Sequence, residues 1–283
     1  MIGKFASLVK ISHTIFAMPF AMVGFFYGYT SQGVAFDWIV LLKIVLCMLF
    51  ARNTAMAFNR LADAAIDAKN PRTASREIPA GVISRRGAGW FVAINIVLFV
   101  VCASTINLLA GLLSPVALFV VMGYSYCKRF TSLAHLVLGM GLSIAPMGAY
   151  IAVSGEFSWV VAALSGAVML WTAGFDIIYA LQDRDFDIKE GLHSIPSKFT
   201  VKEALTISRT LHALSAAMLI IFAKHLPSNP FIWCATGLFI ALMVLQHFVV
   251  TPTRTHRIAM AFGTINGVAS LLYATLTIVG ILR

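Results

Sequence analysis

Long apolar stretches separated by short polar ones dominate the hydrophobic pattern of this chain. A helix that crosses the hydrocarbon core of a bilayer needs about 20 mostly apolar residues. Nine stretches approach or reach that length: 12–30, 38–58, 88–108, 112–127, 133–153, 158–180, 203–223, 230–250 and 259–281. They lack the strict alternation and turn signals of strands, so they do not predict a membrane barrel. We therefore expect an all-α integral membrane protein, with nine transmembrane helices in a single domain over residues 1–283.

The composition supports a membrane protein. The chain is 60% hydrophobic and 11% charged, whereas a soluble domain carries roughly 25% charged residues. Its formal net charge is +10, but no basic patch with interleaved aromatic residues stands apart from the apolar stretches. We therefore expect basic loops at an anionic lipid bilayer and no nucleic-acid partner. The four cysteines are dispersed without a CxxC pair and predict no metal site.

Basic residues are distributed unevenly between the two sides that nine spans would define. One side, together with the N-terminus, has sixteen of them, whereas the other has only Lys224 and Arg283. The sixteen are Lys4, Lys10, Arg60, Lys69, Arg72, Arg76, Arg85, Arg86, Lys128, Arg129, Arg184, Lys189, Lys198, Lys202, Arg254 and Arg257. Cytoplasmic loops carry the excess of Lys and Arg. We expect a multi-pass protein of the inner (plasma) membrane with its N-terminus in the cytoplasm.

Two acidic clusters end the second and the sixth of these stretches, both on the predicted cytoplasmic side. Residues three or four apart share one face of a helix. The first face is Asn59, Asp63 and Asp67, and the second is Asp176, Tyr179, Asp183 and Asp187. Asp185 breaks the second face, and we expect it to face solvent. Each cluster leads into a long polar loop, at about 59–87 and 181–202.

Carboxylates beside a bilayer core are costly and tend to mark functional sites. A single aspartate at a helix end is more often a solvated loop residue, but five acids in two matched sets favour a metal site. Mg²⁺ is usually held by one or two carboxylates together with substrate phosphates, so two acidic faces could hold two ions with a diphosphate between them. Basic residues near these helix ends would complete the anion site: Arg72, Arg76, Lys128, Arg129 and Lys198.

Histidines show no spacing typical of metal ligands. His13, near the cytoplasmic end of the first stretch, is more often a packed residue than a ligand. We assign no role to the remaining six, which are His135, His193, His212, His225, His247 and His256.

Three segments together resemble the UbiA superfamily of intramembrane aromatic prenyltransferases. Asn59-Arg60-x-x-Asp63-x-x-x-Asp67 resembles its first aspartate motif, and Asp176-x-x-Tyr179-Ala180-x-Gln182-Asp183-x-x-x-Asp187 resembles its second. The stretch Tyr124-Ser125-Tyr126-Cys127-Lys128-Arg129-Phe130-Thr131 is similar to the segment between them. The resemblance covers essentially the whole chain. It implies a nine-helix bundle around a central cavity that opens to the cytoplasm and to lipid.

The resemblance also implies an activity, which is transfer of a polyprenyl group from an isoprenoid diphosphate to a hydroxylated aromatic acid in quinone biosynthesis. Mg²⁺ would be the cofactor, and its ligands would be Asn59, Asp63, Asp67, Asp183 and Asp187. Asp176 would lie near the donor or the acceptor, and Tyr179 would serve the same site. Arg72, Lys128, Arg129 and Lys198 would contact diphosphate. Weaker candidates for seating the acceptor are Lys10, His13, Arg52 and Ser125.

One residue departs from the family pattern, because many members have Asp where this chain has Arg60. Together with Asn70-Pro71-Arg72-Thr73 it resembles a bacterial 4-hydroxybenzoate-polyprenyltransferase-like branch, some of whose members serve menaquinone synthesis with a dihydroxynaphthoate acceptor. The acceptor therefore stays open between these two acids, and another acceptor ring is an alternative. A cation- or proton-coupled transporter is an alternative from a different class. It would predict acids near the midplane and broken helices in inverted repeats, whereas both clusters lie at one face.

Overall fold

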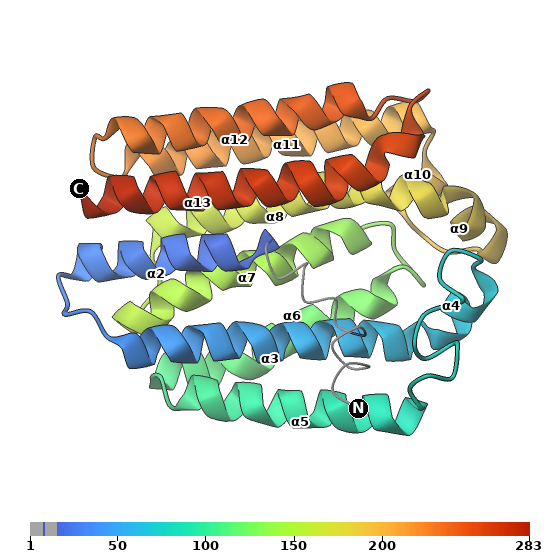
Figure 1. Cartoon of the computed structure of the whole chain (residues 1–283), viewed down its shortest axis with the longest axis horizontal. Coiled ribbons are helices and arrows are strands. Elements are labelled where there is room, and N and C mark those ends of the chain that lie inside the picture. The colour runs from blue at the N-terminus through green and yellow to red at the C-terminus, as the bar shows by residue number, and fades with distance from the viewer. Residues whose placement is uncertain (1–7, 9–15) are drawn as a thin grey trace. The chain divides into compact units, whose positions relative to one another are not determined.

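A computed structural model describes Leu8 and residues 16–283, and every regular element in this part of the chain is helical (Figure 1). The α-helices are α2 (Met18–Gln32), α3 (Trp38–Ala62), α4 (Ala64–Lys69), α5 (Arg85–Ser104), α6 (Leu108–Cys127), α7 (Ala134–Ser154), α8 (Trp159–Ala180), α9 (Arg184–Glu190), α10 (Ile195–Lys198), α11 (Val201–Lys224), α12 (Pro230–Val249) and α13 (Asn266–Leu282). Two 3₁₀ turns, η2 (Leu181–Asp183) and η3 (Thr255–Arg257), and a π-helical turn, η4 (Met260–Ile265), complete the set.

The chain forms two compact units. In its described part, the first unit comprises Leu8 and Trp38–Tyr126, and the second comprises residues 16–37 and Cys127–Arg283. The prediction of a single domain over residues 1–283 stays a prediction.

In the first unit, α3 packs along α5 (Figure 1). Small and branched apolar residues fill their contact, among them Ala57, Ala88 and Val92. Small side chains let membrane helices approach closely, which strengthens their van der Waals packing. The Asn53 Nδ2 also donates to Asn95 Oδ1 at 3.0 Å, which ties the two helices through a half-buried pair.

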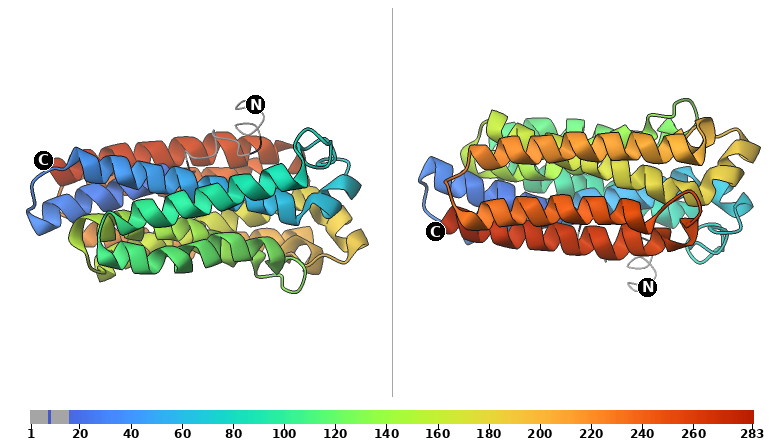
Figure 2. Two further views of the ribbon diagram at one scale, coloured as in Figure 1. Left: turned by 90° about the horizontal axis from the view of Figure 1, so that it is seen from below. Right: turned by 90° about the horizontal axis from the view of Figure 1, so that it is seen from above.

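Helix α8 is the centre of the second unit, because α7 and α11 pack along it. Its Trp171 is fully buried and donates from Nε1 to Asn266 Oδ1 at 3.1 Å. Two hydroxyls of α11 reach α8 carbonyls, with Ser208 Oγ at 2.7 Å from Gly174 O and Ser215 Oγ at 2.8 Å from Ala167 O. Helices α12 and α13 pack against each other, as the orange and red ribbons in Figure 2 show. Hydrogen bonds and packing together therefore fix the helix that carries the second acidic cluster.

Local sequence signals define several helix ends. The Ser158 hydroxyl accepts the backbone N–H of Val161 at the start of α8. Thr200 and Glu203 form a reciprocal capping box at the start of α11. Such side chains satisfy amide groups that have no partner inside the helix. Gly191 has a φ of 66° at the end of α9, a left-handed conformation that favours glycine.

The predicted spans agree with the structure in kind and differ in detail. Within the described residues, eight helices are long and apolar enough to cross a membrane. The predicted first span, 12–30, begins outside the described residues, and α2 covers only its later part, so the count of nine stays a prediction. The fourth span is longer than predicted, because α6 begins at Leu108. The loops predicted at 59–87 and 181–202 contain the short helices α4, α9 and α10.

Candidate active site

The first acidic cluster lies at an interruption between two helices. Helix α3 ends at Ala62 and α4 begins at Ala64, so the helical spacing predicted for Asn59, Asp63 and Asp67 is interrupted at Asp63. Backbone hydrogen bonds still follow helical spacing, from Asp63 N to Asn59 O at 2.9 Å and from Asp67 N to Asp63 O at 2.8 Å. The backbone from Asn59 to Asp67 therefore keeps the i to i+4 hydrogen bonding of a helix across the break.

Asn59 links the cluster to the end of α6. Its Nδ2 lies 3.2 Å from Asp63 Oδ2 and 3.4 Å from Ser125 Oγ, and it is the donor in both contacts. Asp63 is 2% exposed and Ser125 is 1% exposed. Ser125, predicted as a weak candidate for the acceptor, is therefore brought directly to the first motif.

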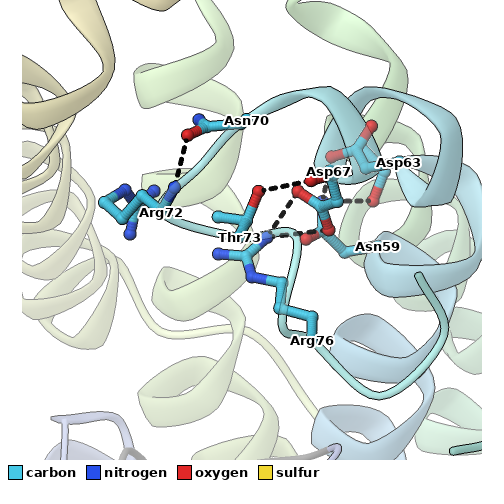
Figure 3. Close-up of polar contacts among 8 residues, drawn as sticks. Asn59, Asp63, Asp67, Asn70, Arg72, Thr73 and Arg76 are labelled. Atoms are coloured by element: carbon cyan, nitrogen blue, oxygen red, sulfur yellow. Dashed lines mark hydrogen bonds and ion pairs between the residues drawn. The ribbon is translucent and has the colours of Figure 1, made fainter. Parts of the chain in front are cut away.

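Asp67 is held by the loop that follows it. Arg76 Nη1 donates to both carboxylate oxygens of Asp67, at 2.7 Å from Oδ1 and 2.9 Å from Oδ2. Thr73 Oγ1 donates to the Asp67 carbonyl at 3.1 Å, and Figure 3 shows both side chains reaching back to this residue. Arg76, which the sequence placed among the diphosphate contacts, thus forms an ion pair with a predicted metal ligand that is 4% exposed.

A tight turn places Arg72 at the surface. The Asn70 Oδ1 accepts the backbone N–H of Arg72 at 2.9 Å, as in turns that Asn commonly forms (Figure 3). The Asn70 carbonyl accepts the backbone N–H groups of Thr73 and Ala74. The side chain of Arg72 is exposed, as expected for a residue that would meet a diffusing anion.

Two more basic residues of the first unit differ in their surroundings. Arg52 is half-buried and lies near Tyr124. Arg60, which stands where many family members have Asp, is buried near Asp67, Glu77 and Arg76. Two of these neighbours are acids and the third is a cation, so the charge of Arg60 interacts with both signs beside the first motif.

The second acidic cluster follows a change of helix type. Helix α8 ends at Ala180, and the 3₁₀ turn η2 leads to α9 at Arg184. A 3₁₀ turn has 3.0 residues per turn instead of 3.6, so the predicted single face is rotated between Asp176 and the later acids. The side chain of Asp185 is 98% exposed, which confirms that it faces solvent.

Asp176 forms a contact with a histidine that no sequence pattern predicted. His135 Nδ1, on the first turn of α7, lies 2.7 Å from Asp176 Oδ2. The histidine is buried, whereas the aspartate is partly exposed. No sequence spacing signals this pair, because 41 residues separate its members and they lie on different helices.

Asp187 is held by the segment that joins α9 to α10. Ser194 Oγ donates to Asp187 Oδ2 at 3.0 Å. Asp183, Lys128 and His135 are close enough to Asp187 to interact with it electrostatically. The backbone of Lys128 is held in place, because its carbonyl accepts a hydrogen bond from the backbone N–H of His193 at 2.7 Å. The structure therefore brings the predicted diphosphate contact Lys128 to the second motif.

The remaining predicted residues are placed less closely. The Tyr179 ring lies 4.3 Å from the Phe262 ring, centroid to centroid, where η4 meets the end of α8. Lys198 is exposed with its Nζ 5.8 Å from the Phe199 ring, and among the described residues it contacts neither Asp183 nor Asp187. Arg129 is half-buried beside Lys128. Lys10 and His13 lie outside the described residues.

The predicted donors could hold a hard divalent cation only together with a substrate. Among the described residues, no group of three or more His, Cys, Asp or Glu side chains could hold a metal ion. Each motif instead offers two carboxylates, at Asp63 and Asp67 and at Asp183 and Asp187. That is the number Mg²⁺ commonly takes from protein when phosphate oxygens and waters complete its shell.

Comparison with known proteins gives the family. The model of the UbiA prenyltransferase family matches residues 17–275, which includes both acidic motifs. The chain belongs to the UbiA prenyltransferase family. A 4-hydroxybenzoate octaprenyltransferase of Aliivibrio fischeri (strain MJ11) is 31% identical over 248 residues, which cover 85% of this chain and 84% of the relative. One of Photobacterium profundum is 34% identical over 205 residues, 71% of each chain.

Solved UbiA structures share the fold. The apo structure of a UbiA homolog from Aeropyrum pernix K1 has a TM-score of 0.80 and 31% identity, covering 96% of this chain and 98% of that one. A UbiA homolog from Archaeoglobus fulgidus bound to GPP and Mg²⁺ has a TM-score of 0.76 and 20% identity, covering 99% and 100%. This UbiA family member is therefore a multi-pass membrane protein and an aromatic prenyltransferase.

Proposed function

We propose that this enzyme transfers a polyprenyl group from an isoprenoid diphosphate to a hydroxylated aromatic acid of the 4-hydroxybenzoate or dihydroxynaphthoate type, for quinone biosynthesis. The observation that carries the proposal is the buried pair Asp63 and Asp67 at the interrupted end of a membrane-length helix. Burying two carboxylates is costly; Arg76 offsets part of that cost at Asp67, and a bound cation with a phosphorylated substrate would add to the compensation. The naming of the relatives as 4-hydroxybenzoate octaprenyltransferases supports the acceptor class.

The residues have separable tasks in this reaction. Asp63, Asp67, Asp183 and Asp187, with Asn59 assisting, would hold Mg²⁺. When bound, such ions stabilise the negative charge of a departing diphosphate, and a UbiA homolog from Archaeoglobus fulgidus binds Mg²⁺ with GPP. Lys128 beside Asp187, together with Arg72, Arg129 and Lys198, would contact the same anion.

The transfer exchanges one bond for another. The C–O bond between the allylic carbon and the diphosphate breaks, and its electron pair leaves with the diphosphate. The allylic carbon bonds to the ring carbon ortho to a hydroxyl, and that ring carbon then loses its proton. Asp176 and Tyr179 are proposed to lie at the ring, with Arg52 and Ser125 as candidates for seating the acceptor's carboxylate. Apolar helices around the site would exclude water from the reactive allylic group.

Product analysis tests the proposal directly. The purified full-length protein is mixed with one long isoprenoid diphosphate, Mg²⁺ and a panel of hydroxylated aromatic acids, and the products are identified by mass spectrometry. We expect a mass increase of one prenyl group on 4-hydroxybenzoate or a dihydroxynaphthoate. Absence of any prenylated acid from the whole panel would refute the proposal.

Chelation provides a second arm of the same assay. EDTA should stop turnover and excess Mg²⁺ should restore it, because the carboxylates cannot bind a diphosphate without a cation. Turnover that continues unchanged in EDTA would exclude the metal assignment and leave the prenyl-transfer assignment standing.

The membrane arrangement is part of the proposal. The asymmetry of Lys and Arg supports an N-terminus on the cytoplasmic side, and the membrane we propose is the inner (plasma) membrane. The site would then receive a water-soluble aromatic acid from the cytoplasm and a lipid-soluble donor from the bilayer.

A further inference from the structure

The histidine beside Asp176 has a defined set of contacts. His135 Nδ1 lies 2.7 Å from Asp176 Oδ2, and its Nε2 accepts the backbone N–H of Ile195 at 3.3 Å. A backbone N–H can only donate, so we assign Nε2 as the unprotonated nitrogen. The proton of the neutral ring is then on Nδ1, from which it is donated to the carboxylate of Asp176.

The Ile195 amide that fixes this tautomer is itself held in place. Ile195 is the first residue of α10, where Ser194 and Ser197 form a reciprocal capping box. The first amide groups of a helix have no partner within it, and the imidazole supplies one here. Ser194 also donates to Asp187 Oδ2 at 3.0 Å. One short turn therefore contacts Asp187 directly and Asp176 through His135.

Asp176 uses only one of its two carboxylate oxygens as a hydrogen-bond acceptor in this pair. Its Oδ2 accepts from His135, whereas its Oδ1 has no hydrogen-bond or ion-pair partner among the described residues. The side chain of Asp176 is 20% exposed. A carboxylate that only joined α7 to α8 in a membrane protein would be expected to satisfy both oxygens.

We propose that His135 is a positioning residue that orients Asp176 so that the free Oδ1 can take the proton from the acceptor ring. This inference rests on the proposed function, in which the ring carbon gains the allylic carbon and must lose a proton. The electron pair of the broken C–H bond stays in the ring, and the proton goes to Asp176 Oδ1. His135 keeps its own proton throughout, because its two nitrogens are already committed to Asp176 and Ile195.

Three substitutions separate the two contacts of the ring. His135→Asn keeps an N–H near the position of Nδ1, His135→Gln keeps an acceptor near the position of Nε2, and His135→Leu keeps neither. The kcat and the KM for each substrate are measured on the full-length protein with 4-hydroxybenzoate and geranyl diphosphate. We expect His135→Leu and His135→Gln to lose roughly 10- to 100-fold in kcat, the size of loss seen when a residue that orients a functional side chain is removed. His135→Asn should retain most of the activity, and KM for the diphosphate should stay unchanged in all three.

The opposite ranking of the Asn and Gln variants in kcat would overturn the proposal. If His135→Gln were active and His135→Asn were not, the contact with Ile195 alone would matter and the histidine would be a structural tether. Equal loss in all three variants, or wild-type kcat in His135→Leu, would contradict it too. Should His135→Leu fail to fold, the comparison of the Asn and Gln variants decides the matter alone.

Two controls separate this inference from the proposed function. If the wild-type protein prenylates no aromatic acid, the proposed function fails. If the wild type is active but His135→Gln retains more activity than His135→Asn, only the role of His135 is removed. The tautomer can also be measured without turnover, from ¹⁵N-histidine spectra of the wild type compared with His135→Asn. An unprotonated Nδ1 in that comparison would overturn the assignment.

Discussion

At the scale of single residues, the two motifs hold their carboxylates in different ways. The charge of Asp67 is neutralised by Arg76, which contacts both of its oxygens. Asp187 instead accepts a hydrogen bond from the uncharged hydroxyl of Ser194. A charge-assisted pair is the stronger of the two. The first motif is therefore more firmly organised before substrate arrives, and a cation binding there must share Asp67 with a guanidinium.

The acids of the second motif provide a test with an internal control. We expect Asp183→Asn to lower kcat by about 100-fold or more, the size seen when a group that stabilises developing charge is removed. Asp185→Asn should leave kcat unchanged, since that neighbouring side chain is 98% exposed. Steady-state prenyl transfer by both variants, with thermal unfolding as a check of folding, measures the difference. Equal activities would remove Asp183 from the metal-binding set.

The sequence predicted these acids and missed their partners for a physical reason. The acids of each motif lie at helical spacing, and such local spacing can be read from a single sequence: Asp63 and Asp67, and Asp183 and Asp187. The contact of His135 with Asp176 depends on how α7 packs against α8, and no local pattern encodes that packing. The pair Arg76–Asp67 depends on the path of a loop, which the Asn70 turn sets only in part.

At the scale of elements, the helices of the second unit approach each other at glycines. A Cβ added to Gly139 of α7 would overlap the backbone carbonyl of Met169 on α8, and one added to Gly24 of α2 would overlap that of Pro146 on α7. Small residues permit this close approach in membrane helices. The apolar pattern predicted the helices themselves, but it did not reveal the 3₁₀ turn η2, the π turn η4 or the break at Asp63. Each of these is a local change in helical hydrogen bonding that is too short to alter the spacing of apolar residues over a whole helix.

Alanine substitutions at two glycines of α7 distinguish the effect of close packing on stability from the effect of helix propensity. Gly139→Ala should destabilise the protein by about 1–3 kcal/mol, the usual cost of overpacking. Gly148→Ala meets nothing within 4 Å of the added Cβ, so it should be neutral or stabilise the helix by up to about 1 kcal/mol. Thermal unfolding in detergent measures both. If Gly139→Ala were as stable as Gly148→Ala, the close contact of α7 with α8 would be wrong.

At the scale of the whole molecule, the hydrophobic pattern predicted the class of fold, whereas the two aspartate motifs and the segment between them predicted the family. Eight membrane-length helices within the described residues and a family match over residues 17–275 agree with that prediction. Charge is the whole-molecule property that bears on orientation, because sixteen Lys and Arg residues were assigned to one side and only Lys224 and Arg283 to the other.

Chemical labelling tests this orientation. In a variant whose four cysteines are replaced by alanine, a single cysteine is introduced at Lys189 or at Ser228, both of which are exposed. A membrane-impermeant maleimide applied to intact spheroplasts should label Ser228→Cys only, and it should label Lys189→Cys only after the membrane is opened. The reverse pattern would place the N-terminus outside.

Asp176 is a residue of α8, which packs against α7 and α11 and is mostly buried within the protein. Membranes of different thickness would strain the peripheral helices first. The proton-accepting end of the enzyme should thus keep its geometry across hosts with different lipid compositions, whereas sensitivity to lipid should concentrate where the hydrocarbon tail of the donor lies.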